Sequence, residues 1–399
     1  MLDDEDQSPE FQLRVVRQFD EFTAKEWSSL AGTSKGHGNY NPFLSYHFLN
    51  ALEKSASATS ATGWRPYHLR LETADGILLG AVPAYLKSHS QGEYVFDHGW
   101  ADAYERAGGR YYPKLQICVP FTPATGSRLL HNRDYEPAAI RQALALGLQQ
   151  LTDQLGISSA HVTFVDEAQL KPLEKADFLH RTDLQFHFIN NGFSQYDDFL
   201  SEFSSRKRKL IKKERKEALS NGITIEWLQG EQITEDVLDQ FFAFYMDTGS
   251  RKWGRPYLTR EFYTLIGETM ADDILLVMAK RDGRYIAGAI NFIGSDTLFG
   301  RHWGCIEDHP FLHFEVCYHQ AIEFAIQHKL DKVEAGAQGD HKIARGYQPV
   351  LTHSAHYITH QGLRNAVADY LDTERQDVMR MAVSLQDHLP FRKTPELDT

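Results

Sequence analysis

The sequence predicts a mixed α/β (α+β) fold made of two similar halves. Along the 399 residues, β-favouring apolar runs alternate with segments of helical periodicity. Each half has a hairpin in which an Asp-Gly turn leads into a strand containing Gly-Ala, at 75–81 and at 282–289. YVFDHGW (94–100) is also similar to LFGRHWG (298–304). The copies are about 205 residues apart, too far for a solenoid repeat, so we infer a domain duplication.

The first half is expected to contain two main helices. Phe48, Leu49 and Leu52 recur at helical spacing, which predicts an amphipathic helix within 41–58. Pro137 suits the first turn of a second helix, at 136–155. The predicted strands are 11–16, the hairpin arms 64–72 and 77–89, and a buried strand at 158–165.

The second half opens with a predicted strand at 184–189 and a strongly basic helix at 204–219, which Asn221 and Gly222 end. Further helices are expected at 234–247, 259–270, 312–329 and from Tyr370 to about Gln386, with a loop at 248–257. The predicted strands are 223–228, the hairpin 274–294, and the segments 297–304 and 332–336.

Length and composition indicate a folded, soluble protein of two or three domains. We expect a disordered acidic leader at 1–10, domains at 11–180 and 181–370, and a C-terminal helix and tail at 371–399. Three cysteines without a C-x-x-C pair support neither a disulfide framework nor a cysteine zinc site. His309 and His313 do not form H-E-x-x-H, so no metal site is expected. No apolar run approaches the length of a membrane span, and we expect a cytoplasmic protein.

Basic residues concentrate at 206–216 (RKRKLIKKERK), which carries +7 while the rest of the chain carries −19. The net charge of −12 opposes general adhesion to nucleic acid or to anionic membranes. Leu210, Ile211, Ala218 and Leu219 leave a narrow apolar stripe for packing. A solvated charged face is one interpretation. The other is a phosphate site for a nucleotide-linked precursor, coenzyme A or tRNA, because like charges at this density repel without an anion.

A second candidate segment is 335–349 (AGAQGDHKIARGYQP). A strand leads into a glycine-rich turn and a short helix, which places free backbone N–H groups beside Lys342 and Arg345. Gly336 and Gly339 allow close backbone approach to a phosphate or a developing oxyanion. The segment has no Walker or dinucleotide pattern, and a purely structural turn is the alternative.

These motifs, taken in order, resemble those of the FemABX peptidoglycan-bridge aminoacyltransferases and, more closely, of the FemAB-like predicted N-acyltransferases of bacteria. The similarity covers about residues 40–362. The motifs are the basic helix at 204–215, TG-x-R at 248–251, the hairpin at 282–289, FGRHWG at 299–304, a helix opening at 313–315, and G-x-x-G-x-x-K-x-x-R-G-Y within 333–347.

The resemblance implies tandem GNAT-type acyltransferase domains, each a mostly antiparallel twisted sheet flanked by helices. It implies that Arg251 helps to bind a diphosphate and that Lys342 contacts the reacting centre. The sequence departs from the family at Lys252, where the family has Asp, and at 345–347, where Arg-Gly-Tyr replaces Phe-Gly. A long coiled-coil arm is also missing from the second half. The donor therefore stays open between acyl-CoA and aminoacyl-tRNA.

We expect an N-acyltransferase that uses such a donor as co-substrate, without a tightly bound cofactor, and an amine acceptor such as a cell-wall peptide precursor. Lys342 is the expected oxyanion or leaving-group contact, and Glu334 and His302 are candidate bases. The expected phosphate or substrate contacts are Arg251, Arg345, Arg206, Lys207, Arg208, Lys209, Gly336 and Gly339. The alternative is a catalytically silent pair of GNAT domains that binds RNA or a phosphorylated precursor through the basic helix.

Overall fold

A computed structural model describes residues 11–32, 40–252, 256–336 and 339–392 and divides them into two compact units. Unit 1 contains the described parts of 1–33, 43–182 and 352–375, and unit 2 those of 34–42, 183–351 and 376–399. The expected leader at 1–10 lies outside the described residues. The domain limits 11–180 and 181–370 stay predictions. In the structure, residues 352–375 pack with unit 1.

Unit 1 contains a small antiparallel sheet and a second group of strands. The small sheet has the order β1-β3-β4-β7, formed by β1 (Phe11–Val16), β3 (His68–Thr73), β4 (Leu78–Val82) and β7 (Leu130–His131). The second group has the order β15-β8-β6-β5-β2, formed by β2 (Trp64–Pro66), β5 (Ala84–Lys87), β6 (Lys114–Ile117), β8 (Ser159–Val162) and part of β15 (Gln348–Ile358). In this group only β6 and β8 pair in parallel.

The helices of unit 1 lie where helical periodicity and turn residues meet. Helix α4 (Pro137–Gln154) begins with Pro137 in its first turn, as predicted. Ser45 caps α2 (Tyr46–Lys54), which occupies the central part of the expected helix at 41–58. The other helices are α1 (Ala24–Ala31), α3 (His98–Arg106), α5 (Leu170–Lys175) and the first part of α12 (Gln361–Gln386).

Two expectations for unit 1 are wrong in detail. The arms of the predicted hairpin at 64–89 divide between two sheets, because Pro66 and Pro83 lack the N–H that a continuous strand ladder needs. The similarity of 94–100 to 298–304 does not reflect a shared strand, since residues 98–100 begin α3. In unit 1, β6 pairs in parallel with β8, the strand that follows α4.

Unit 2 has a sheet with the order β10-β11-β12-β13-β14-β9. Its strands are β9 (Leu179–Ile189, from 183 onward), β10 (Thr224–Leu228), β11 (Ile274–Arg281), β12 (Arg284–Ile293), β13 (Thr297–Cys305) and β14 (Lys332–Glu334). Among the described strands of this sheet, β13 and β14 pair in parallel and the other neighbours pair antiparallel. Positive φ angles at Asp282 and Gly283 form the predicted hairpin turn.

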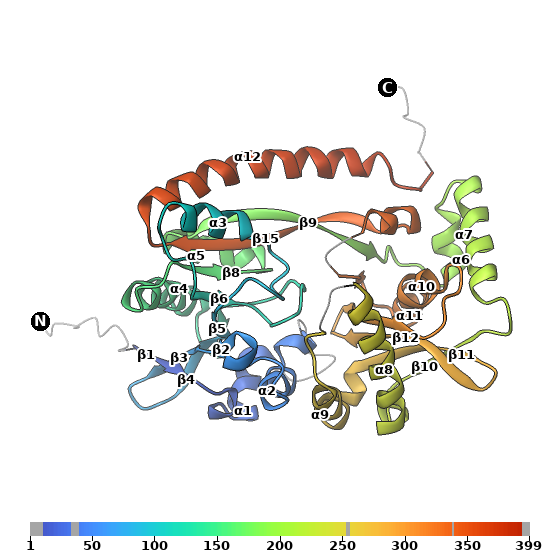
Figure 1. The fold of residues 1–399 in the computed structure, drawn as a ribbon, viewed down its shortest axis with the longest axis horizontal. Coiled ribbons are helices and arrows are strands. Elements are labelled where there is room, and N and C mark those ends of the chain that lie inside the picture. Colours follow the sequence, from blue (N-terminus) through green and yellow to red (C-terminus); the bar gives the residue numbers. More distant parts are fainter. Residues whose placement is uncertain (1–10, 33–39, 253–255, 337–338, 393–399) are drawn as a thin grey trace, which may run out of the picture. The chain divides into compact units, whose positions relative to one another are not determined.

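Helices cover both faces of β13, the strand that pairs with β12 (labelled in Figure 1). Along this strand, Gly304 and His302 face α8 (Glu235–Lys252), whereas Trp303 faces the helical segment that starts with α10 (Leu312–Phe314). That segment continues as a π-helical turn (Glu315–His319) and α11 (Gln320–Gln327). The remaining helices are α6 (Tyr196–Ser201), α7 (Ser205–Ala218), α9 (Arg260–Met270) and the last part of α12.

Three helix predictions need correction. The expected loop at 248–257 is helical as far as Lys252, since the first proline that interrupts the helix pattern is Pro256. Helix α12 starts at Gln361, before the expected Tyr370, because Leu363 and Val367 are buried against unit 1. The apolar stripe of α7 is narrower than predicted. Ile211 and Ala218 are buried, whereas Leu210 and Leu219 are exposed.

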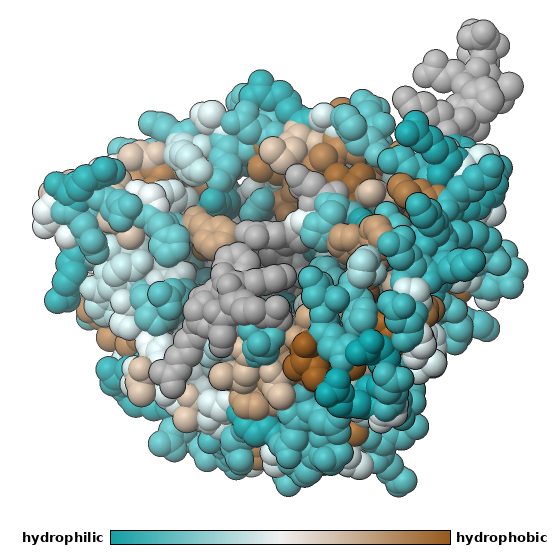
Figure 2. Space-filling model, turned by 45° about the vertical axis from the view of Figure 1, so that its right-hand side comes forward, coloured by the Kyte–Doolittle hydropathy of each residue, from teal (hydrophilic) through white to brown (hydrophobic). Residues whose placement is uncertain are grey.

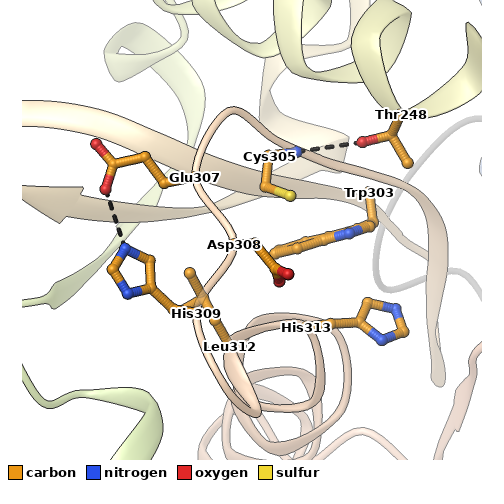
Figure 3. A pocket seen from close by; sticks show the side chains of 8 residues that line it. All are labelled: Thr248, Trp303, Cys305, Glu307, Asp308, His309, Leu312 and His313. Atoms are coloured by element: carbon orange, nitrogen blue, oxygen red, sulfur yellow. Dashed lines mark hydrogen bonds and ion pairs between the residues drawn. The ribbon is translucent and has the colours of Figure 1, made fainter. Parts of the chain in front are cut away.

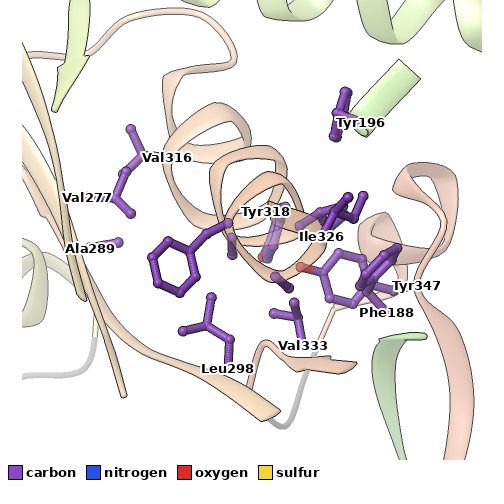
Figure 4. Close-up of a cluster of buried hydrophobic side chains, with 14 of the residues drawn as sticks. Phe188, Tyr196, Val277, Ala289, Leu298, Val316, Tyr318, Ile326, Val333 and Tyr347 are labelled. Atoms are coloured by element: carbon purple, nitrogen blue, oxygen red, sulfur yellow. The ribbon is translucent and has the colours of Figure 1, made fainter. Parts of the chain in front are cut away.

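Each unit has its own hydrophobic core. In unit 2, side chains from β11, β12 and β13 meet those of the π-helical turn and α11 (Figure 4). In unit 1, a separate cluster lies among β3, β4, β6, β8 and α4. The mixed α/β, mostly antiparallel fold class is therefore confirmed, with a hairpin, a strand, a helix and a parallel strand in each unit. Among the described helices, none combines the length and apolar character that a membrane span requires.

Candidate active site

The parallel strands β13 and β14 form a wedge in unit 2. They pair over three residues only, from Thr297↔Lys332 to Phe299↔Glu334, and β13 then continues to Cys305 while β14 ends. A cavity of about 90 Å³ opens between residues 300–303 and Ala335. Glycine fits at position 300, because a Cβ atom there would lie only 3.3 Å from Asn291 Oδ1, a tight contact. We call this opening the wedge.

A larger cavity of about 240 Å³ adjoins the wedge (Figure 3). Trp303 and His313 line both cavities, so the two spaces meet at these rings, whose centroids are 5.2 Å apart. The other lining residues are Thr248, Cys305, Glu307, Asp308, His309 and Leu312. The Thr248 hydroxyl oxygen accepts a 3.3 Å hydrogen bond from the backbone N–H of Cys305 on β13. We call this space the Trp303 cavity.

The π-helical turn beside the wedge is held from α7. Arg215 binds the fully buried Glu315 through Nε and Nη2, at 2.9 and 2.7 Å, and also reaches Glu323. Gln320 donates a further 2.7 Å hydrogen bond to Glu315. One cation of the basic helix therefore has a structural role, which sequence analysis missed. π-helical turns are frequent at functional sites, and this one contains Tyr318 and follows His313.

Lys342 lies in the short helical turn Asp340–Arg345 and is buried. Its Nζ donates a 2.9 Å hydrogen bond to the Gly336 carbonyl. Burial lowers the pKa of Lys342 to about 8. Gly336 and Gly339 both have positive φ angles, as the predicted turn requires. The Lys342 side chain is therefore hydrogen-bonded to the turn that follows β14. The role of Lys342 in the reaction belongs to the proposed function.

Arg345 is engaged within the protein. Its Nη2 binds Glu214 at 2.8 Å, its Nη1 donates to the His341 carbonyl at 2.9 Å, and the guanidinium carbon lies 3.4 Å from the Phe314 ring centroid. Through these contacts Arg345 connects α7 with the helical segment beside the wedge. A phosphate would have to share Arg345 with these groups.

The two candidate bases differ in environment. His302 lines the wedge, and its ring centroid is 5.0 Å from that of Tyr245. Burial lowers the pKa of His302 well below its usual value, so the imidazole is neutral at pH 7. Glu334 is the last residue of β14, is buried, and forms a 3.5 Å ion pair with Lys332.

The remaining candidates lie on α7 and α8. Arg206, Lys207 and Lys209 are exposed and Arg208 is half-buried, in the first turns of α7. Figure 2 turns the side on which Figure 1 labels α7 toward the viewer, and much of that face is hydrophilic. Arg251 belongs to the last turn of α8, and its side chain lies outside the described residues. No group of metal-ligating side chains occurs in the described part of the chain.

Sequence analysis did not select Trp303, His313 or Asp308 as site residues. Trp303 and His313 do occur in motifs used for the resemblance, but one belongs to a strand and the other to the following helix. Asp308 lies in the connecting segment and carried no signal. The lining of the Trp303 cavity depends on how the strand and the helix pack, which residue spacing does not report.

Comparison with known proteins agrees with this architecture. A FemAB-like family profile, described as peptidoglycan biosynthesis/recognition, matches residues 18–393. No curated protein sequence matches the chain significantly.

Solved structures with a similar fold include one described as FemX, with a TM-score of 0.53 and 14% identity over 87% of this chain and 98% of its own. A conserved protein of unknown function from Bacteroides thetaiotaomicron has a TM-score of 0.52 and 10% identity, over 88% of this chain and 100% of its own. A tandem GNAT protein from the clavulanic acid biosynthesis pathway has a TM-score of 0.43 and 11% identity, over 88% and 98%.

Proposed function

Because the chain belongs to the FemAB-like family, we propose that it is an N-acyltransferase whose reaction takes place at the wedge of unit 2. The observation that carries this proposal is the wedge itself, an opening between two parallel strands with a second cavity beside it. Acyl transfer between two substrates needs two spaces that meet at the reacting atoms. Trp303 and His313 mark where the spaces meet.

The proposed reaction is attack of an acceptor amine on the carbonyl carbon of an acyl ester or thioester. The C–N bond forms, the carbonyl oxygen becomes an oxyanion, and the C–O or C–S bond then breaks as the amine loses its proton. Positioning supplies most of the acceleration, about 7–11 kcal/mol for well-oriented reactants. Electrostatic stabilisation of the oxyanion adds roughly 3–4 kcal/mol.

Lys342 is proposed to stabilise the oxyanion or the leaving group. With a pKa of about 8, its ammonium is mostly protonated at pH 7 and can pass a proton to the departing oxygen or sulfur more readily than an ordinary lysine. The Gly336 carbonyl orients this ammonium in the absence of substrate. In the reaction, the oxyanion would compete with that carbonyl for the Nζ protons.

Glu334 and His302 are the proposed groups that receive the proton of the amine. Neutral His302 is placed in the wedge and can accept a hydrogen bond from the amine, but its low pKa makes it a weak base. Glu334 carries a buried carboxyl group and is located one residue before Ala335 of the wedge. We therefore assign proton removal to Glu334 and orientation of the amine to His302.

The exposed cations Arg206, Lys207 and Lys209, together with Arg208, are proposed to bind the phosphates of the donor, either acyl-CoA or aminoacyl-tRNA. Arg251 and Arg345 are proposed to contribute further phosphate contacts, and Gly336 and Gly339 to allow close approach. The family description, peptidoglycan biosynthesis/recognition, supports a cell-wall peptide precursor as the proposed acceptor. The proposed setting is the bacterial cytoplasm.

The test is a transfer assay with a pool of radiolabelled aminoacyl-tRNAs and, separately, a pool of acyl-CoAs, each with a panel of peptide amines. If the chain is an enzyme, the wild type should turn over. The Lys342→Ala variant should lose turnover but still bind the donor. Charge reversal at Lys207 and Lys209 should weaken donor binding. If Lys342→Ala changes nothing and only charge reversal removes ligand binding, the chain is a silent binding module and the enzyme proposal fails.

A further inference from the structure

Helix α7 carries a continuous row of cations on one face. The row follows at intervals of three or four residues, which aligns its members along the helix: Arg206, Lys209, Lys213 and Lys216. All four are exposed, and none forms an ion pair within the part of the chain that the structure describes. We call these residues the outer row. Like charges at this spacing repel one another, so an anion bound to the outer row would stabilise the helix.

A second face of α7 is buried in unit 2. Ile211 and Ala218 pack there, and two charged residues, Glu214 and Arg215, lie between them in sequence. These two side chains reach different segments. Glu214 binds the helical turn that contains Lys342, and Arg215 binds the π-helical turn. Two consecutive residues of one helix therefore hold both segments that border the wedge.

Arg215 holds the π-helical turn and α11 along one helix face. Its guanidinium donates to Glu315 at 2.7 and 2.9 Å and to Glu323 at 2.9 Å. The guanidinium carbon also lies 4.4 Å from the ring centroid of Tyr196, whose hydroxyl oxygen is 2.7 Å from Nδ1 of His319. Positions 315, 319 and 323 are four residues apart and so share a face. Since the π-helical turn supplies one wall of the wedge, α7 fixes the orientation of that wall.

Glu214 holds the helical turn that carries Lys342. Glu214 Oε2 accepts a 2.8 Å hydrogen bond from Arg345 Nη2, and Arg345 Nη1 donates to the His341 carbonyl at 2.9 Å. Arg345 and Lys342 belong to the same turn, Asp340–Arg345. Both members of the ion pair are largely buried, with 7% and 13% of their side chains exposed. Apolar side chains would pack α7 here at a lower desolvation cost, which favours a role of the ion pair in setting geometry.

We propose that Glu214 and Arg215 are positioning residues, through which an anion bound to the outer row of α7 orders the Lys342 turn and the π-helical turn. The anion is the phosphate of the donor, so this inference rests on the proposed function and adds that donor binding assembles the wedge. When the donor binds, repulsion within the outer row falls and α7 is stabilised. Glu214 and Arg215 then hold the two segments in one arrangement, with Lys342 in place for the acyl carbonyl. Such coupling is reciprocal, so a loosened wedge also weakens donor binding.

The first experiment uses coenzyme A and a pool of deacylated tRNA as probes, because both present phosphates and neither can transfer an acyl group. Amide hydrogen exchange is measured at saturating probe on the wild type, on Glu214→Gln and on Glu217→Gln. Glu217 is an exposed carboxylate of the same helix and provides the matched control. In the wild type and the control, at least one probe should protect residues 312–323 and 340–347. In Glu214→Gln, protection of 340–347 should be lost and the affinity for the probe should fall about fivefold.

The second experiment measures transfer with the donor found active. Arg215→Lys keeps the charge that Glu315 needs but loses the contact through two nitrogen atoms. With the donor at saturation, Arg215→Lys and Glu214→Gln should each lower kcat per folded molecule about tenfold and leave KM for the acceptor nearly unchanged. Glu217→Gln should match the wild type. A purely structural role would lower the melting temperature and leave kcat per folded molecule unchanged.

The possible failures can be told apart. Probe binding that protects neither segment of the wild type, or equal protection in Glu214→Gln and the wild type, would overturn the inference, whereas transfer would leave the proposed function intact. Protection that depends on Glu214, without transfer from any donor, contradicts the proposed function alone. If neither probe binds the wild type, the inference fails together with the assignment of donor phosphates to α7.

Discussion

Each unit contains a pair of parallel strands, β6 and β8 in unit 1 and β13 and β14 in unit 2. The space beyond the paired residues is filled in unit 1 and open in unit 2. In unit 2, β13 and β14 separate after three residue pairs and leave the wedge. In unit 1, β6 and β8 also pair over three residues, but the following chain fills the space. Thr163 N–H binds the Ile117 carbonyl, and Gly126 forms a bridge with Val165.

Arg128 completes the closure in unit 1. Its side chain is fully buried and donates to the carbonyls of Thr163, Ala124 and Ser127, at 3.0, 2.7 and 3.3 Å. In an open site, such a guanidinium could bind a ligand. Here the Arg128 guanidinium donates its hydrogen bonds to backbone carbonyls instead. We conclude that the duplicated topology forms a filled, structural wedge in unit 1 and an open one in unit 2.

Two buried lysines show the same contrast. In unit 1, Lys114 binds Glu93 at 2.6 Å and Asp97 at 2.5 Å, and these carboxylates outweigh burial and raise its pKa. In unit 2, Lys342 has only a carbonyl partner among the described residues, and burial lowers its pKa to about 8. Fully paired buried charges are typical of structural networks, whereas an unpaired ammonium is available to substrate.

The largest expected effect is on stability, from Arg128→Ala in unit 1. Three backbone carbonyls, two of them in buried hydrogen bonds, would lose their donor, which should lower the free energy of unfolding by about 3–5 kcal/mol. Transfer per folded molecule should not change. Urea unfolding and a transfer assay normalised to folded protein measure the two quantities. Arg133→Ala, at an exposed position of the same unit, is the control and should change stability by under about 0.5 kcal/mol. Loss of transfer in folded Arg128→Ala would contradict a purely structural role for unit 1.

In contrast to Arg128→Ala, the Lys342→Met variant should lose activity while its stability rises. Loss of the ammonium removes the oxyanion or leaving-group contact, so kcat should fall about 100-fold or more. The melting temperature at pH 7 should rise, because a buried charge without a counter-ion is replaced by an apolar side chain. Steady-state kinetics and calorimetry on the same preparation provide the measurements. A variant that is less stable and equally active would show that Lys342 is structural.

The pH dependence of unit 2 should run in opposite directions for activity and stability. The pKa of Lys342 is about 8 in the folded protein, against an ordinary value of 10.5. Between these pH values the unfolded chain binds more protons at Lys342 than the folded protein does. The free energy of unfolding therefore rises with pH over this range, and it falls again as the pH is lowered to about 8. The catalytic ammonium, however, is lost above about pH 8. Rates and urea midpoints from pH 7 to 10 test this, and Lys342→Met should abolish the stability slope.

The smallest expected effect comes from the surface of α7. Replacing Lys207 and Lys209 with Glu should weaken binding of the donor about tenfold at low salt and reduce its salt dependence, with little effect on kcat at saturation. Filter binding or fluorescence anisotropy over a salt series measures this. The Lys212→Glu variant is a comparison on the same helix, where the wild-type side chain already pairs with Asp197 at 3.0 Å. Equal losses in both would indicate general charge effects without a defined site.

Local sequence signals predicted most elements of the fold. The Asp282-Gly283 turn, the Pro137 helix start and the basic helix are set by residues adjacent in sequence, and each is found where expected. The helical extent of 248–252 was missed, because TGSR resembles a loop until the helix before it is known. The division of the hairpin at 64–89 between two sheets depends on strand partners far away in sequence.

The candidate site was predictable only where one short segment builds it. The glycine turn and Lys342 belong to a single segment, so the sequence could place them together. The Trp303 cavity combines α8, β13 and the segment leading to α10, and its lining could not be inferred from spacing. Likewise, the closing of the unit 1 wedge by Arg128 depends on contacts with residues about 40 positions away, such as Gln169.

Whether acyl transfer takes place in unit 2 is tested most directly by amide hydrogen exchange on the full chain. The exchange is measured with and without a saturating donor, using an aminoacyl-tRNA pool and an acyl-CoA pool in turn. We expect at least one donor to protect residues 300–305 and 340–345 of unit 2, while residues 118–128 and 163–165 of unit 1 exchange as before. Protection centred on the unit 1 segments, or no protection at the wedge with either donor, would contradict the assignment of acyl transfer to unit 2.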